Sequence, residues 1–311
     1  MINKLYLLLI TLFLSSYFYS IVEEDPLPTL GDYSSASISL SGEYELGRLW
    51  LAMYRGSTKE HSDPLMRTYL EDLIYRLSET SEVRDRRFEF IILEDESINA
   101  FAAPGGIIGI NLGMFLNTKR EGELASVMCH ELAHLSQRHY ARSQNRSSPL
   151  ANALMILASI AVAAASRNPE AIVIAPAAMQ QMSINYTRSN EKEADRIGFN
   201  NLVKAGFDPN DMTMMFQRMQ DKYQREDSEQ FSYLMTHPLP SERLTDMRIR
   251  AANISKPFEG SFRDNLDFYF MQKRSEIWAE KDTKKLTKKY RKDLKSDQKN
   301  ISLSSRYGLA L

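Results

Sequence analysis

Two histidines and a glutamate at helical spacing are the residues of this sequence best suited to chemistry. His130 and His134 are four positions apart, and Glu131 lies between them. On a helix, residues i and i+4 are about 40° apart around the axis, so both imidazoles face one point. That geometry suits one zinc ion per chain, with Glu131 close enough to activate a water without being a ligand. The alternative is two polar residues with ordinary partners, but the apolar segment 124–128 predicts a buried helix, where unpartnered histidines are costly.

A third protein ligand is needed to complete such a zinc site. The metzincin pattern is excluded, because Gln137 stands where that class has glycine and Tyr140 where it has histidine. A glutamate from a later helix is the other arrangement, and Glu191 can supply it. Asp195 is one helical turn on, where it can accept a hydrogen bond from a ligand imidazole, whereas Glu193 points away. The alternative for this segment is a solvated acidic turn.

The elements that must position these residues are mostly helical. A long helix is predicted from Glu121 to about Ser143, beginning in acidic residues as helix N-termini prefer, and a second over 183–205. Aromatic and β-branched residues predict a strand over 88–93, and a strand pair over 98–110 turns at Pro104-Gly105-Gly106. Apolar periodicity predicts further helices at about 43–53, 64–81, 210–225, 242–254 and from 266 onward. The expected fold class is therefore α+β, dominated by helices with one small sheet.

The N-terminus predicts export. A lysine in the first four residues precedes an apolar run over 5–14, followed by serines and then acidic residues. This is the layout of a signal peptide, assigned to residues 1–21, and it predicts a periplasmic protein. Phe18 and Tyr19 crowd the cleavage region, so an uncleaved anchor is the alternative. An extended lead-in over 22–42, a metalloprotease domain over 43–265 and a helical tail over 266–311 complete the predicted organisation.

Composition limits the partners. Apolar residues make up 43% and charged residues 25%, as in globular proteins, and the lone Cys129 excludes an internal disulfide. From residue 271 onward there are 12 Lys and Arg against 5 Asp and Glu, but no glycine-aromatic pattern for nucleic acid. We therefore predict a solvated basic helix and no nucleic-acid partner. Segments 150–165 and 171–182 are apolar but too short to cross a bilayer, which leaves open a plug over the cleft, a peripheral membrane contact or a core hairpin.

Five short motifs resemble one enzyme family. They are Asn99-Ala100-Phe101-Ala102 with Pro104-Gly105-Gly106, the segment 124–134, the segment from Asn190 to Gly198, Gly206-Phe207-Asp208-Pro209, and the segment from His237 to Arg243. Together they resemble the HtpX-like zinc endopeptidases, a gluzincin family that includes the CAAX-processing proteases. The resemblance spans about residues 27–270. The last residues, Tyr307-Gly308-Leu309-Ala310, resemble the start of a tetratricopeptide helix, which cannot bury its face alone, so the sequence is either truncated or has lost its repeats.

The resemblance implies a set of roles. It makes Glu191 the third ligand and Glu131 the general base, and it places the 99–110 strand at the substrate cleft. Asn99, Phe101, Gly105, Gly106 and Ile108 are accordingly expected to bind substrate. An extended substrate would add as a strand at the sheet edge near 105–110, which suits unfolded or misassembled envelope proteins and suggests contact with the outer-membrane assembly machinery.

His237 and two arginines leave alternatives open. His237 precedes a proline in a loop that lies beside the metal in the family. It is either a fourth ligand that shuts the site, a donor to the transition-state oxyanion, or a loop histidine without a catalytic role. Arg188 and Arg243 are candidates for steadying this region or ordinary surface residues, and His139 is taken as structural. The predicted function is a zinc endopeptidase; the rival is a chaperone or assembly scaffold with a silent metal site.

Overall fold

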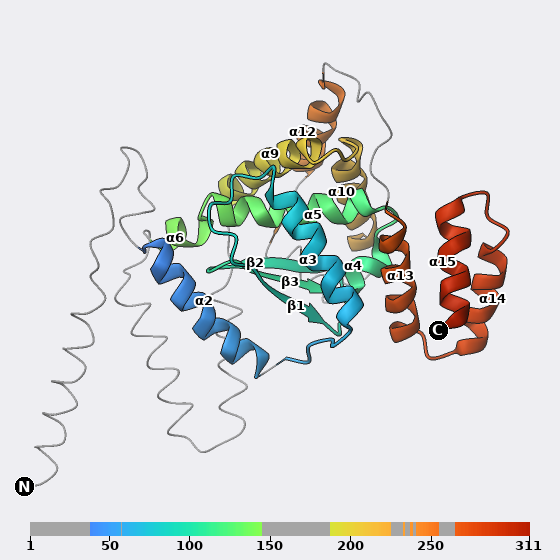
Figure 1. Cartoon of the computed structure of the whole chain (residues 1–311). Helices are drawn as coiled ribbons and strands as arrows, with labels where there is room; N and C mark the ends of the chain where they lie inside the picture. Colours follow the sequence, from blue (N-terminus) through green and yellow to red (C-terminus); the bar gives the residue numbers. More distant parts are fainter. Residues whose placement is uncertain are drawn as a thin grey trace, which may run out of the picture.

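The computed structural model describes residues 38–56, 58–144, 187–224, 233, 237–238, 241–254 and 265–311. Helices dominate these residues, and a three-stranded sheet lies among them (Figure 1). The predicted α+β class is confirmed. The expected signal peptide and the apolar segments 150–165 and 171–182 lie outside the described residues. Within the described residues, no helix combines the length and the apolar character that crossing a membrane requires.

The sheet consists of β1 (Glu89–Leu93), β2 (Ala100–Ala103) and β3 (Ile107–Asn111) in the order β1-β3-β2. β2 and β3 form the predicted antiparallel hairpin, and β1 pairs with β3 in parallel. Gly105 and Gly106 have φ angles of 76° and 78°, which glycine adopts without strain, so the chain can reverse there. Because β3 pairs with both β1 and β2, it is the central strand. The prediction that residues 105–110 form an open edge is wrong; among the described strands, β2 is an edge.

The two faces of the sheet are covered by different elements. One face joins the main core together with α3 (Pro64–Ser78), α4 (Leu112–Asn117) and α5 (Glu121–Ser136). The other face packs under α2 (Leu40–Arg55), where Leu51 meets residues of all three strands. Successive strand residues point to opposite faces, so the alternation along β2 decides which side chains turn toward α5.

Helix α9 (Arg188–Lys204) packs closely along α5 (Figure 1). The approach depends on Gly198, because a Cβ there would lie only 2.9 Å from the backbone nitrogen of His130. Helices α10 (Asn210–Tyr223) and α12 (Ser241–Ala252) pack beside this pair. The close α5–α9 contact brings the first two turns of α9 against the second half of α5.

The predicted single helix over 121–143 is broken. Helix α5 ends at Ser136, and the short α6 (His139–Gln144) follows after Arg138. Arg138 has a φ of 50°, the left-handed region that a non-glycine residue rarely adopts. Its guanidinium donates hydrogen bonds to the Glu43 carboxylate and to the Ile38 carbonyl, and these contacts hold the turn.

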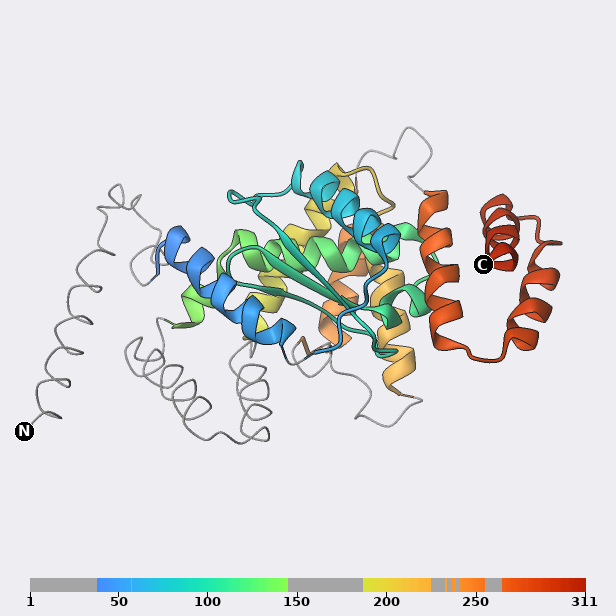
Figure 2. The ribbon, with the colours of Figure 1, turned by 60° about the horizontal axis from the view of Figure 1, so that its bottom comes forward.

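The C-terminal helices lie at one end of the molecule (Figure 2). Helix α13 (Leu266–Ala279) packs on α3 and α4, and α14 (Thr283–Asp293) and α15 (Lys299–Ala310) pack with it. Leu286 and Tyr290 of α14 are buried, whereas its lysines are exposed, as expected for a solvated basic face.

Asp211, in the first turn of α10, predicts a pH dependence of stability. Its side chain is fully buried against Gly122 of α5. Burial raises its pKa from 3.8 to about 7, with Asp208 and Glu123 adding to the rise and Arg120 opposing it. A carboxyl with a raised folded-state pKa destabilises the fold once it ionises, so stability falls as the pH rises from about 4 to about 7, by up to about 4 kcal/mol.

Asp211→Asn should remove this loss, because the amide does not ionise. The free energy of unfolding of the metal-free protein, measured in urea between pH 4.5 and 8, should rise relative to the wild type only toward the upper end of that range. Asp246→Asn is the matched control, since Asp246 is 46% exposed and paired with Arg250 on the surface. A variant-to-wild-type difference that does not change with pH would contradict the assignment.

Candidate metal centre

The two histidines of α5 face each other in the interior. His130 and His134 are 0% and 2% exposed, and their Nε2 atoms are 3.0 Å apart. The helix places both rings on the side that meets α9, as the four-residue spacing predicts.

Glu191 and His237 complete a cluster of four donor groups. The Glu191 carboxylate, in the first turn of α9, has one oxygen 3.4 Å from His130 Nε2 and the other 3.3 Å from His134 Nε2. His237 Nδ1 lies 3.1 Å from the nearer Glu191 oxygen and 3.4 Å from His130 Nε2. All four residues are buried, and one ligand atom from each lies within 4.8 Å of the others.

These distances fit a tetrahedral divalent ion. For metal–ligand bonds of about 2.0–2.1 Å, the donor atoms of a tetrahedron are about 3.3–3.4 Å apart. The separations of 3.0 to 3.4 Å among His130, His134, Glu191 and His237 are close to that spacing. Three imidazoles and a carboxylate are also the ligand types that zinc prefers. The residues present therefore fit a bound zinc ion.

The charge states of His134 and Glu191 agree with ligand roles. Burial lowers the pKa of His134 well below its ordinary value, which keeps that imidazole neutral. Burial alone would raise the pKa of Glu191, but His237, His130 and His134 hold it well below its ordinary value. At His130, burial opposes the effect of Asp195 and Glu191, which together raise the pKa to about 9. Binding of a metal at His130 therefore has to release a proton.

Asp195 and Arg243 form a buried layer behind the ligands. Asp195 Oδ1 lies 2.9 Å from His130 Nδ1. Arg243 donates to both Asp195 oxygens at 2.6 and 2.7 Å, contacts a Glu191 oxygen at 2.8 Å and donates to the Pro238 carbonyl. This layer fixes the orientation of one ligand imidazole and ties the Glu191 carboxylate to the His237 loop. Arg188, in contrast, is exposed and has no ion pair among the described residues, which favours the alternative of an ordinary surface residue.

His139 contacts the second ligand imidazole. Its Nδ1 lies 2.8 Å from His134 Nδ1, and its Nε2 lies 3.2 Å from a Glu193 oxygen. His139 was predicted to be structural. On a continuous α5, its side chain would point about 140° away from that of His134 around the helix axis. The break at Arg138 brings it back. A non-glycine residue in the left-handed region has no reliable sequence signal, so this contact was not predictable.

Glu131 lies beside the cluster and is not part of it. Its carboxyl is fully buried, and neither oxygen has a hydrogen-bond partner among the described residues. One oxygen is 3.7 Å from His237 Nε2. Burial raises the pKa of Glu131, although nearby imidazoles oppose the rise. A buried carboxyl with a raised pKa next to four donor groups is the arrangement that a general base requires.

Tyr233 was not singled out in the sequence. Its ring stacks on the His237 imidazole, with centroids 4.6 Å apart and planes 21° apart. The backbone N–H of His237 also donates to the Tyr233 carbonyl at 2.7 Å. Tyr233 therefore contributes to holding His237 at the cluster.

The expected substrate-binding residues do not all face the cluster. Phe101 turns to the opposite face of the sheet and packs against Trp50 and Tyr54 of α2. Ile108 is buried in the main core on the central strand, which is paired along both edges, so a substrate strand cannot add there and this part of the prediction is wrong. Phe101 lies on β2, where its backbone can still pair with a substrate, so its role stays a prediction. Gly105 lies in the hairpin turn under α2, where Arg48 donates to its carbonyl.

The start of β2 remains a substrate edge to be tested. Asn99 is half-buried directly before the strand, and the backbone of Ala102 lies close to the Glu131 carboxyl. Gly106 shapes the hairpin turn, and its backbone packs on the Arg87 carbonyl, so we assign it no direct contact with substrate.

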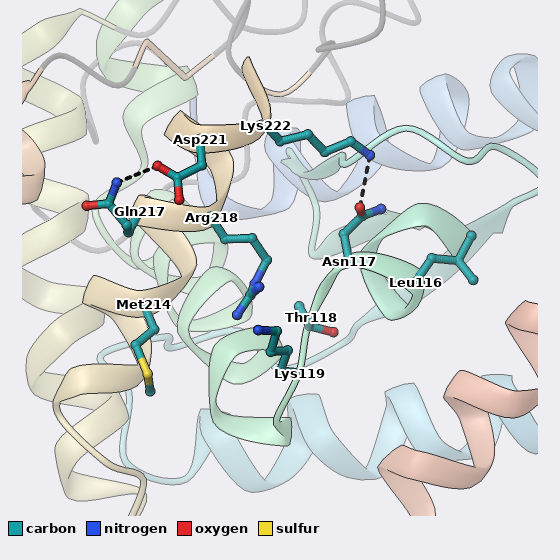
Figure 3. Close-up of a pocket in the computed structure, with 9 residues that line it drawn as sticks. All are labelled: Leu116, Asn117, Thr118, Lys119, Met214, Gln217, Arg218, Asp221 and Lys222. Carbon is teal, nitrogen blue, oxygen red and sulfur yellow. Dashed lines mark hydrogen bonds between the residues drawn. The ribbon is translucent and has the colours of Figure 1, made fainter. Parts of the chain in front are cut away.

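A surface pocket of about 550 Å³ lies elsewhere, between α10 and the segment that follows α4 (Figure 3). Several of its polar groups already have partners: Arg218 binds Glu123, and Lys222 donates to Asn117. No member of the metal cluster lines it. The pocket therefore gives no reason to place the peptidase substrate there.

Comparison with known proteins identifies the class. The family model described as Peptidase family M48 matches residues 64–251, which include His130, His134, Glu191 and His237. The chain belongs to peptidase family M48. This confirms the resemblance found in the motifs.

Individual relatives refine the comparison. The chain is 41% identical over 242 residues to a protein of Vibrio cholerae assigned to the β-barrel assembly-enhancing proteases, covering 75% of this chain and 49% of the relative. It is 36% identical over 258 residues to the β-barrel assembly-enhancing protease of Escherichia coli, covering 81% of this chain and 52% of the relative. A mitochondrial metalloendopeptidase, OMA1 of Schizosaccharomyces pombe, is 25% identical over 73% of this chain and 66% of its own length. The chain thus spans about half the length of the bacterial relatives.

Proposed function

We propose that this chain is a zinc-dependent endopeptidase of the periplasm that degrades unfolded or misassembled envelope proteins, among them outer-membrane proteins. The observation that carries the proposal is the buried cluster of His130, His134, Glu191 and His237 with the buried Glu131 carboxyl beside it. The names of the bacterial relatives, which refer to β-barrel assembly, support the substrate class and a role near the assembly machinery. The signal-peptide layout of residues 1–21 supports the compartment.

The proposed mechanism assigns one task to each group. When bound by His130, His134 and Glu191, zinc supplies Lewis-acid chemistry, polarising the scissile carbonyl and lowering the pKa of water. Glu131 takes the proton from the attacking water and delivers it to the leaving amine. Asp195 and Arg243 hold the ligands in place. The edge of β2 that has no partner strand among the described residues, beginning at Asn99, pairs with the backbone of an extended substrate, so unfolded segments are selected with little regard to side chains.

The substrate class is tested by comparing two forms of one protein. We expect the zinc-loaded enzyme to cleave an unfolded outer-membrane β-barrel polypeptide and to spare the same polypeptide folded in detergent. A chelator should stop cleavage, and added zinc should restore it. If neither form is cut, even by the His237→Ala variant, the chain acts as a chaperone or scaffold with a silent metal site.

The position of His237 suggests that the activity of the metal site is regulated. Its Nδ1 is within 3.1–3.4 Å of Glu191 and His130, which is a position for a fourth ligand. A fourth protein ligand would leave no place for the attacking water, and the enzyme would rest in a shut state until the loop moved. A donor to the oxyanion is the alternative role for the same residue.

The sign of the activity change in His237→Ala separates the two roles. We expect basal proteolysis to rise, with zinc occupancy nearly unchanged, because His130, His134 and Glu191 remain. If His237 donates to the oxyanion instead, its loss should lower the rate on the order of 100-fold. Initial rates on an unfolded polypeptide, together with zinc content per chain, give the answer, and equal rates in both proteins would contradict both roles.

A further inference from the structure

His134 and His139 face each other through their Nδ1 atoms, 2.8 Å apart. The other ring nitrogen of His134, Nε2, belongs to the metal cluster, since it lies 3.0 Å from His130 Nε2 and 3.3 Å from Glu191. The other ring nitrogen of His139 lies 3.2 Å from Glu193. A chain of contacts therefore runs from the cluster through two imidazoles to a carboxylate near the surface.

The positions of the protons along this chain follow from the chemistry of imidazole. A metal on His134 Nε2 leaves the proton of that ring on Nδ1. His134 Nδ1–H must then donate to His139 Nδ1, which accepts only if its own proton is on Nε2. That proton points at the Glu193 carboxylate, which accepts it. One set of tautomers thus satisfies the contacts of His134 with the metal, of His134 with His139 and of His139 with Glu193, and neither ring has to be charged.

The contact between His134 and His139 depends on an unfavourable backbone conformation at Arg138, which lies between them. Arg138 adopts a φ of 50°, and the turn that results places His139 against His134. Such a conformation is unfavourable for a residue with a side chain, so other contacts must hold it. Arg138 is held there by the Glu43 carboxylate and the Ile38 carbonyl.

The Nδ1 atoms of both ligand imidazoles then have comparable hydrogen-bond partners. His130 Nδ1 lies 2.9 Å from Asp195, whose carboxylate Arg243 holds. His134 reaches Glu193 through His139, and Arg142 donates to the same Glu193 oxygen at 2.9 Å. Each α5 ligand is therefore connected to one carboxylate of α9, and each carboxylate to an arginine.

We propose that His139 and Glu193 are positioning residues that fix the ring orientation and tautomer of the metal ligand His134. The inference rests on the proposed metal site, and it goes beyond it by assigning a role to two residues outside the ligand set. His139 provides the acceptor that keeps His134 Nε2 aimed at the metal. Glu193 fixes His139 in the tautomer that can accept. Loss of such outer contacts typically weakens metal binding by about 10–100-fold.

The test is the zinc dissociation constant of the full chain, measured by competition with a chromophoric chelator. His139→Leu keeps the volume and removes the acceptor, so the constant should rise by about 10–100-fold. His139→Asn should restore much of the affinity, because its amide oxygen can accept from His134. Glu193→Gln should have a smaller effect than His139→Leu, because the glutamine oxygen still accepts from His139. The visible absorption of the cobalt-loaded protein should shift in His139→Leu and less in His139→Asn.

His61→Leu is the matched control. His61 Nδ1 contacts Glu94 at 3.2 Å, the same kind of pair, and neither residue belongs to the metal cluster. The free energy of unfolding of the metal-free variants shows whether the fold is intact. Wild-type zinc affinity in His139→Leu would overturn the proposal. Equal losses in the leucine and asparagine variants would overturn it as well, since they would indicate packing alone. Failure of the metal site itself is recognised separately, because the wild type would then bind no zinc and Glu191→Ala would change nothing.

Discussion

Replacing Glu131 with glutamine is expected to abolish peptide hydrolysis while leaving the zinc content and the fold unchanged. Glu131 is not one of the four clustered donors, and its oxygens have no hydrogen-bond partner among the described residues, so the amide disturbs few contacts. It cannot take a proton from water, however. Loss of a general base typically costs 10²–10⁴-fold, so the rate on an unfolded polypeptide should fall by at least about 100-fold.

The design of this experiment separates base from ligand. Zinc per chain and the thermal midpoint of unfolding are measured on the same preparations as the cleavage rate. Glu242→Gln is a matched control, because Glu242 is exposed at the start of α12 and pairs only with Lys192 among the described residues. Turnover within a few-fold of the wild type in the Glu131 variant would show that another group is the base.

Replacing Glu191 with alanine is expected to remove most of the zinc affinity. The carboxylate supplies an anionic donor 3.3–3.4 Å from both α5 imidazoles. Among the described residues, its loss also leaves Asp195 as the only charged partner of Arg243. If an apparent binding free energy of about 10–16 kcal/mol is shared among His130, His134 and Glu191, one ligand contributes about 3–5 kcal/mol, or about 10²–10⁴-fold in affinity.

Zinc content after dialysis against a weak chelator is the measurement for this variant. The wild type should keep about one ion per chain, and Glu191→Ala should keep almost none. Glu242→Ala serves again as the control, since it removes a glutamate at the surface. A full complement of zinc in Glu191→Ala would mean that another residue is the third ligand.

The ligand residues were predictable because their spacing is local. His130 and His134 share α5, and Glu191 and Asp195 share α9, so the period of each helix alone decides which of its side chains face together. Arg243 and His237 required the resemblance, since nothing in their own segments indicates where a loop and a third helix pack. The structure brings both to the cluster, but the role of His237 stays a prediction.

The errors arose where a long-range or strained feature decides the result. The β2–β3 hairpin is a local structure and was predicted, but the parallel pairing of β1 with β3 is not, and it turned the expected edge into the centre of the sheet. The side of the strand that Phe101 occupies depends on that register. His139 was missed because the positive φ of Arg138 overrides the helical period.

Anomalous diffraction at the zinc absorption edge tests the central claim most directly. Crystals of the zinc-loaded protein should show one strong peak per chain. That peak should lie about 2.0–2.2 Å from His130 Nε2, His134 Nε2 and a Glu191 oxygen. A single site at another position, or these three atoms remaining beyond bonding distance of the ion, would contradict the account.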